Sequence, residues 1–203
     1  MQRFVTLLLF FSAAAVSGIL ITACGSSSSS SPDSSDAITQ GTPVEIENNP
    51  PGDIPDDQAF VPYHSDAGGY TLDTPEGWAR TESGPNVTFV DKLNSIAVEV
   101  IPQDAAPTVD SVTADELPAL SAQVGAFENV KVETVDLPSG QAVFIRYRAN
   151  SEPDSVTGKQ VRLEIDRYEI FKDGRLAALS LSAPAGSDNV DVWRQISRSF
   201  TWD

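Results

Sequence analysis

Residues 161–181 read VRLEIDRYEIFKDGRLAALSL, and this stretch decides the fold class. Aliphatic and charged side chains alternate along residues 161–166, which is the period-two pattern of a strand with one buried face. The apolar side continues one residue late at Tyr168, so we expect a β-bulge near residues 166–167. An Asp-Gly pair at 173–174 predicts a tight turn into a second strand. The stretch therefore predicts a long antiparallel hairpin.

One helix is predicted before this hairpin and one after it. The first has Asp115 as its N-cap and Pro118 in its first turn, where a missing N–H does no harm. Its apolar face comprises Leu117, Leu120, Val124 and Phe127. The second runs from about residue 188 to 198, with Arg194 and Arg198 near its negative C-terminal end. Its inward side chains comprise Val192, Trp193, Ile196 and Phe200.

Shorter alternating segments extend the strand pattern through the rest of the domain. They predict strands around residues 70–73, 86–91, 96–100, 130–132 and 142–147. Strands joined by hairpins, with helices inserted at two points, indicate an α+β fold with a mainly antiparallel β-sheet packed against helices.

The N-terminus has the pattern of a bacterial export signal. An apolar run without acids follows Arg3 and ends in ITACG at residues 21–25. This ending resembles the lipobox of bacterial lipoproteins, in which the cysteine is acylated and becomes the new N-terminus. The resemblance implies that Cys24 carries the lipid that anchors the protein at the extracytoplasmic face of the cell membrane. A retained transmembrane helix and a plain secretory signal are the alternatives.

The chain is expected to fall into three parts. Residues 1–23 are the lipoprotein signal peptide, 24–67 a disordered tether rich in Ser, Pro and Asp, and 68–203 the folded domain. The apolar residues 60–63 are an exception within the tether, and we expect them to dock on the edge of the domain.

The charge and the cysteine count exclude several kinds of binding. The whole chain has a net charge of −16, and after removal of residues 1–23 it keeps 12 basic and 29 acidic side chains, a net charge of −17. Such a chain repels nucleic acid and anionic lipid head groups, so no nucleic-acid partner is expected and membrane attachment must be hydrophobic. The single cysteine rules out an intrachain disulfide and a multi-cysteine zinc site. No cofactor or metal is expected.

Catalytic groups are also lacking in the sequence. His64 is the only histidine, it lies in the approach to the domain, and no Gly-x-Ser-x-Gly motif is present. We therefore expect a protein that is not an enzyme. The candidate recognition residues are a charged stripe and one aromatic side chain: Arg146, Arg148, Arg162, Glu164 and Trp78. The alternative for the stripe is a solvated sheet face with cross-strand ion pairs, and the alternative for Trp78 is a core position.

The order of the elements carries a resemblance to a known fold family. Together with TPEGW at residues 74–78 and Ser199-Phe200 at the end, it resembles the PsbP-like fold family. That family includes a photosystem II extrinsic protein, a Ran-binding nuclear-transport factor and actinobacterial lipoproteins of the LpqN/LpqT kind, to which the lipobox and serine-rich tether are most similar. Because its members are mostly binding or assembly proteins, the resemblance implies a non-enzymatic protein-binding or assembly module of the cell envelope, with an envelope or extracellular protein as partner. A carrier of a small apolar ligand, such as a lipid or cell-wall precursor, is the alternative, and an envelope hydrolase is the least favoured reading.

Overall fold

The computed structural model describes residues 41–46 and 52–203. The expected signal peptide, its lipobox and Cys24 lie outside the described residues. In chain order the strands are β1 Phe60–Ser65, β2 Tyr70–Pro75, β3 Ala79–Ser83, β4 Asn86–Asp91, β5 Asn94–Pro102, β6 Gly125–Leu137, β7 Gly140–Asn150, β8 Arg162–Lys172, β9 Arg175–Pro184 and β10 Thr201–Trp202. The helical segments are α1 Val109–Ser111, the π-helix η1 Val112–Glu116, α2 Leu117–Gln123 and α3 Val190–Ser199.

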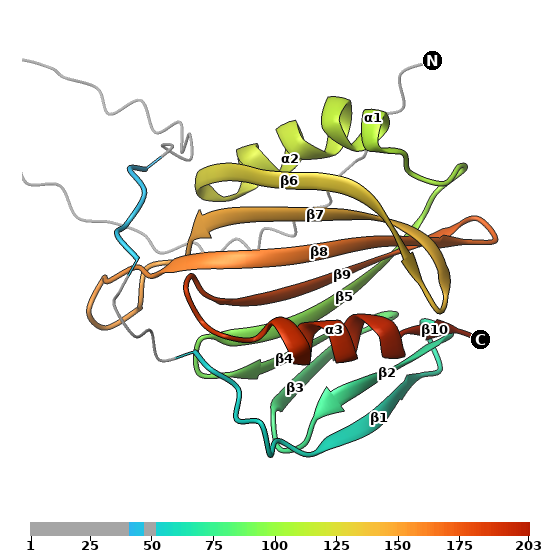
Figure 1. Cartoon of the computed structure of the whole chain (residues 1–203), viewed down its shortest axis with the longest axis horizontal. Helices are drawn as coiled ribbons and strands as arrows, with labels where there is room; N and C mark the ends of the chain where they lie inside the picture. Colours follow the sequence, from blue (N-terminus) through green and yellow to red (C-terminus); the bar gives the residue numbers. More distant parts are fainter. Residues whose placement is uncertain (1–40, 47–51) are drawn as a thin grey trace, which may run out of the picture. The chain divides into compact units, whose positions relative to one another are not determined.

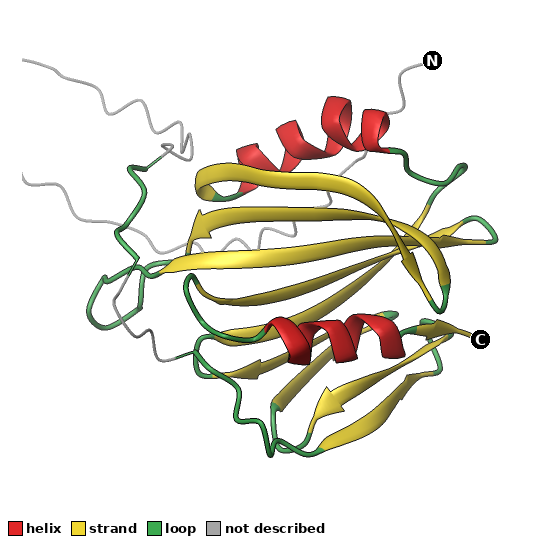
Figure 2. Ribbon diagram, viewed as in Figure 1, coloured by secondary structure: helices red, strands yellow, loops and turns green. Residues whose placement is uncertain are grey.

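The strands form two antiparallel sheets (Figure 1). The large sheet has seven strands in the order β3-β4-β5-β9-β8-β7-β6, and the small sheet has three in the order β1-β2-β10. The predicted α+β class, with a mainly antiparallel sheet packed against helices, is confirmed (Figure 2).

The large sheet is covered on both faces, which explains the shifted apolar pattern of β8. Ile170 belongs to the core beneath α3 and the small sheet, whereas Ile165 belongs to a second core beneath α1 to α2. These two residues have opposite parity on the strand, so they point to opposite faces. The predicted bulge at residues 166–167 is wrong, because β8 pairs with β7 and β9 without a register shift. The two ends of β8 simply bury different faces.

The first helical segment starts earlier than predicted. Thr108, not Asp115, is its N-cap, and Thr108 and Ser111 form a reciprocal capping box. Asp115 lies inside the π-helix, one turn before Pro118, whose missing N–H disrupts the ordinary α-helical ladder. The helix ends at Gln123, so Phe127 lies in β6, although it still packs against the second core as expected.

The ordered structure also begins upstream of residue 68. β1 pairs with β2 along its whole length, so residues 60–63 form part of the edge strand of the small sheet. Farther upstream, Asn189 holds the backbone at two points: the Ile54 N–H donates to its Oδ1 at 2.8 Å, and its Nδ2 donates to the Gly52 carbonyl at 2.9 Å. The predicted boundary therefore falls inside a hairpin, because buried polar contacts fix a segment whose composition is typical of a linker.

A second asparagine holds the chain in the same way. Asn150 accepts a bond from the Val44 N–H at 3.1 Å and donates to the Thr42 carbonyl at 3.0 Å. In both cases one side-chain carboxamide bonds to a backbone N–H and to the backbone carbonyl two residues before it. A neighbouring strand would bond to the same two groups. The described part of the expected tether is thus attached to the domain.

Replacing Asn189 with alanine is expected to loosen this attachment. Asn189 is buried, and its loss leaves the Ile54 N–H and the Gly52 carbonyl without their partners, which costs about 2 kcal/mol of unfolding free energy. Chemical denaturation measures this loss, and hydrogen exchange of the Ile54 amide should speed up. Asn129→Ala, on the exposed part of β6, is the control. Unchanged exchange at Ile54 would contradict the prediction.

A groove between helix α3 and the large sheet

A groove of about 280 Å³ lies between α3 and the β6–β7–β8 part of the large sheet. Its apolar lining comprises Val135, Leu137, Phe144, Tyr168, Val190 and Trp193. Its charged lining comprises Glu133, Arg146, Asp166, Arg194 and Arg198. The groove thus combines an aromatic and aliphatic surface with an excess of arginine.

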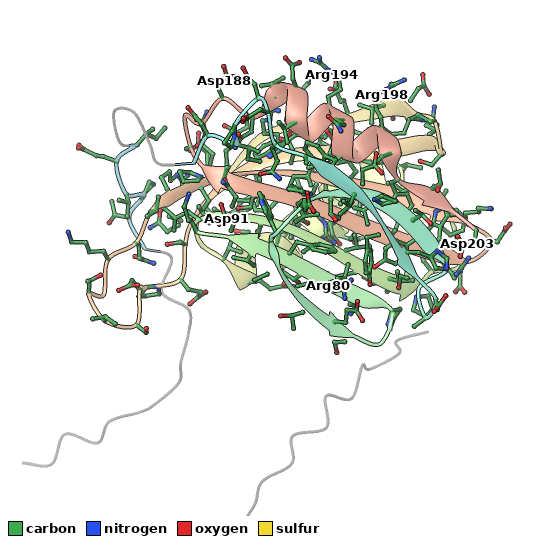
Figure 3. All side chains as sticks on the ribbon, turned by 90° about the horizontal axis from the view of Figure 1, so that it is seen from below. Arg80, Asp91, Asp188, Arg194, Arg198 and Asp203 are labelled. Carbon is green, nitrogen blue, oxygen red and sulfur yellow. The ribbon has the colours of Figure 1, made fainter. Side chains whose placement is uncertain are left out.

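Helix α3 supplies one wall because its two sides differ in polarity. Trp193 and Ile196 are buried against the sheet, whereas Arg194 and Arg198 are one turn apart on the flank that borders the groove and project from the helix (Figure 3). Arg194 donates to Asp191 at 2.7 Å in a solvent-exposed pair, which contributes little to stability. The Arg198 side chain has no hydrogen bond or ion pair to other described residues. Within residues 41–46 and 52–203, its guanidinium is therefore unpaired.

The opposite wall contains a buried carboxylate held by an arginine. Arg146 donates from Nε and Nη2 to the two oxygens of Asp166 at 2.6 and 2.7 Å. The Asp166 side chain is only 4% exposed, and this burial raises the pKa of its carboxyl, against the opposing effect of Arg146. The bidentate bond to Asp166 in turn raises the pKa of Arg146, so the guanidinium stays charged. This pair gives the groove a fixed polar end.

The predicted charged stripe lies on this same face of the sheet. Arg148 donates to Glu164 at 3.0 Å, and Arg162 donates to Glu128 at 2.9 Å and to the Ala126 carbonyl at 2.6 Å. Arg146, Arg148, Arg162 and Glu164 are thus brought together in ion pairs between strands, although the face is less solvated than the alternative assumed. Arg162 is only 3% exposed, and of the four residues only Arg146 lines the groove. A recognition role for the stripe stays a prediction.

Trp78 lies away from this groove. It is partly buried and packs against the core shared by α3 and the small sheet, while Trp193 and Trp202 are buried members of that core. Trp193, not Trp78, lines the groove. Sequence reasoning missed this site, although one signal was present: two arginines at i and i+4 beside an inward tryptophan on one helix.

The other face of the sheet carries a second charged cluster. Arg167 donates from Nε to Glu169 at 2.6 Å and from Nη2 to Glu116 at 2.9 Å. Glu169 is only 2% exposed, and burial raises the pKa of its carboxyl although Arg167 opposes the shift. Glu116 is the last residue of the π-helix η1, so its bond to Arg167 connects this helix to the pair. The cluster joins the helical segment to β8.

Residues 41–46 and 52–203 contain no group of three or more His, Cys, Asp or Glu side chains placed to hold a metal ion. In that part of the chain, no helix has the length and apolar character needed to cross a membrane. His64 lies on β1, where it is exposed and contacts Asp66 at 3.0 Å.

Comparison with known proteins shows the fold. No protein-family model matches the sequence, and no curated protein matches it. Among solved structures, cyanobacterial PsbP from Synechocystis superposes with a TM-score of 0.53 at 15% identity, covering 72% of this chain and 94% of the other. The Ran-binding protein Mog1p from Saccharomyces cerevisiae gives 0.48 at 11% identity, with 72% and 96% covered. LpqN from Mycobacterium tuberculosis, described as involved in cell envelope biogenesis, gives 0.39 at 18% identity, with 72% and 91% covered. The expected PsbP-like fold is confirmed by the first of these.

Proposed function

We propose that this chain is a lipid-anchored, non-enzymatic module that binds a segment of an envelope or extracellular protein in the groove beside α3. The observation that supports this most strongly is the free Arg198 at the rim of an apolar groove, in a chain with a strong net negative charge. Arginine and aromatic side chains supply most of the energy at protein interfaces, and Trp193 and Arg198 are of these types.

The groove favours binding over catalysis because its polar groups are not arranged as a nucleophile and base. Ser197 lines the groove, but its hydroxyl donates to the carbonyl of Arg194 on the preceding turn. His64, the only histidine in the sequence, lies on β1 of the small sheet. Asp166 is occupied by a bidentate bond to Arg146. A hydrolytic triad would need these groups in contact.

The size of the groove favours a protein segment over a small apolar ligand. Sites for small molecules usually measure about 300–1,000 Å³ and enclose most of the ligand, whereas this groove is at the lower end of that range and is open to solvent. One or two side chains of a partner fit such a space. A carrier of a lipid or cell-wall precursor stays the second candidate, supported by the apolar lining. Mass spectrometry of an organic extract of the purified chain would find such a cargo.

The anchor is the part of the proposal that depends on the sequence alone. The lipobox at residues 21–25 and the serine run after it are typical of exported lipoproteins, and they motivate a kinship with the LpqN/LpqT lipoproteins. The lipid on Cys24 would hold the groove near the membrane on the extracytoplasmic side.

Reversing the charge of the groove rim is the test of this function. A photo-crosslinking amino acid at Val190, which lines the groove, should capture one partner protein in intact cells. Adding Arg194→Glu and Arg198→Glu is expected to reduce the yield of this crosslink at least tenfold. The two arginines would bind an acidic side chain of the partner, and both changes place negative charge at that position. Lys92→Glu with Lys159→Glu changes the net charge equally at exposed sites elsewhere. Equal loss of crosslinking in both double variants would contradict a role for the groove.

A further inference from the structure

β6 is an edge of the large sheet and borders the groove. It is 13 residues long, it pairs with β7 on one side, and no described strand pairs with it on the other. Its residues Glu133, Val135 and Leu137 line the groove opposite α3. A free edge presents unpaired backbone N–H and C=O groups, which another extended chain can use.

The two halves of β6 differ in how regularly they pair with β7. Its register to β7 shifts between Gly125 and Glu128 and again between Asn129 and Lys131, and such bulges twist a strand away from incoming partners. In the second half, Lys131–Leu137 pairs with β7 without a further shift. The regular half is therefore the half that borders the groove. Its charged side chains, Lys131, Glu133 and Asp136, limit which chains can pair with this edge.

The register indicates which backbone groups face outward. Leu137 and Gly140 are partners across a two-residue turn, and the pair that closes such a hairpin is a hydrogen-bonded one. Because bonded and non-bonded pairs alternate along an antiparallel ladder, the N–H and C=O groups of Val132, Thr134 and Asp136 turn away from β7. These three residues make no backbone–backbone hydrogen bond to any other described segment.

We propose that the partner segment binds as an added strand on residues 131–137 of β6, with apolar and acidic side chains alternating on the face that enters the groove. This rests on the proposed function and names its binding mode. A strand added there continues the sheet, so every second side chain lies beside Val135 and Leu137 and below the rim of α3. The Arg198 side chain has no partner among the described residues, which calls for a carboxylate on that face.

A second copy of the same chain is a poorer occupant. Each mature chain carries a net charge of −17, so two copies repel one another. A β6-to-β6 pair would also place Asp136 of each copy at the shared edge, and like charges close together on paired strands are destabilising. A segment of another protein whose acidic side chains all lie on the groove face does not place a like charge beside Asp136.

The test uses the full chain, purified in detergent, and a synthetic peptide of about eight residues, Leu-Thr-Glu-Thr-Leu-Thr-Glu-Thr. The peptide should slow hydrogen exchange of the Thr134 and Asp136 amides at least tenfold at saturation, because these amides become bonded. Replacing both Glu residues of the peptide with Lys is expected to weaken binding at least tenfold. Binding at millimolar peptide without protection of these amides would overturn the proposal, as would no binding at all.

Backbone methylation of the peptide separates strand addition from mere charge attraction. A peptide N-methylated at alternate residues on its pairing edge loses its ladder bonds, whereas one methylated on its other edge keeps them. We expect at least tenfold weaker binding for the first and little change for the second. Equal binding of both would overturn strand addition.

The peptide test can fail while the crosslinking test of the proposed function succeeds. If the crosslink at Val190 depends on Arg194 and Arg198 while both methylated peptides bind alike, the groove binds a partner but β6 adds no strand. Protection of the Thr134 amide that rises with protein concentration, without peptide, would identify a second copy as the occupant and overturn the proposal.

Discussion

Arg167→Met is expected to lower the free energy of unfolding by about 3–5 kcal/mol, because it leaves a buried carboxylate without its cation. Arg167 is buried and its Nε bonds to Glu169 at 2.6 Å, and Glu169 is only 2% exposed. Methionine has a similar length and fills much of the same space, so little of the loss comes from packing. Urea denaturation at neutral pH measures the change.

The loss in this variant should depend on pH in a defined direction. Burial raises the folded-state pKa of Glu169 above its ordinary value of 4.5, and Arg167 opposes that rise. A carboxyl with a raised folded pKa contributes stability that is present below the unfolded pKa and is lost as pH rises through the folded pKa. Without Arg167 the pKa rises further, so this loss extends to higher pH. The variant should therefore be closest to the wild type at about pH 4 and least stable relative to it near neutrality.

A paired substitution provides the matched control. Removing both charges with Arg167→Met and Glu169→Gln is expected to recover most of the stability, because no uncompensated buried charge is left. Glu116, the third member of the cluster, is 33% exposed and can be solvated after Arg167 is removed. If the double variant were as unstable as Arg167→Met and showed the same pH dependence, the loss would come from packing and the electrostatic account would be wrong.

The parts of the fold that were predictable are those encoded by local patterns. The hairpin around residues 173–174 and helix α3 follow from turn chemistry and helical spacing, and both are present. The bulge in β8 was wrong because a change of apolar phase has two causes, an extra residue or a change of the buried face. Only the position of the covering helices distinguishes them. The domain boundary was misplaced for a related reason, since the asparagines that bind Thr42, Val44, Gly52 and Ile54 are more than 100 positions away in the sequence.

The candidate site shows the same limit. Arg146 and Glu164 were singled out from the sequence because their strands were expected to be neighbours, and the ion pairs are there. The groove itself needs α3 to lie over β6 and β8, and no local pattern states where a helix packs. Arg162 looked like a surface residue, yet it is buried because the irregular start of β6 turns the Ala126 carbonyl to it. Tertiary contacts decide which charges remain free.

Cys24→Ala is expected to move the protein from the membrane fraction to the soluble fraction, or to stop its processing. After removal of residues 1–23 the chain has a net charge of −17, and anionic head groups repel it. The acyl groups on Cys24 would therefore anchor the protein in the membrane. Stable anchoring needs two or more acyl chains.

Fractionation of cells that express the full chain with each variant measures this effect. Ser26→Ala is the matched control, because it changes a neighbouring small residue and keeps the lipobox intact. The mature wild type should also gain mass from its acyl chains, and Cys24→Ala should lack that gain. If Cys24→Ala left both membrane attachment and apparent mass unchanged, the apolar run before Cys24 would be a retained transmembrane helix. In that case the domain would still face outward, but the anchor would be peptide rather than lipid, and loss of the cysteine would not free the groove from the membrane.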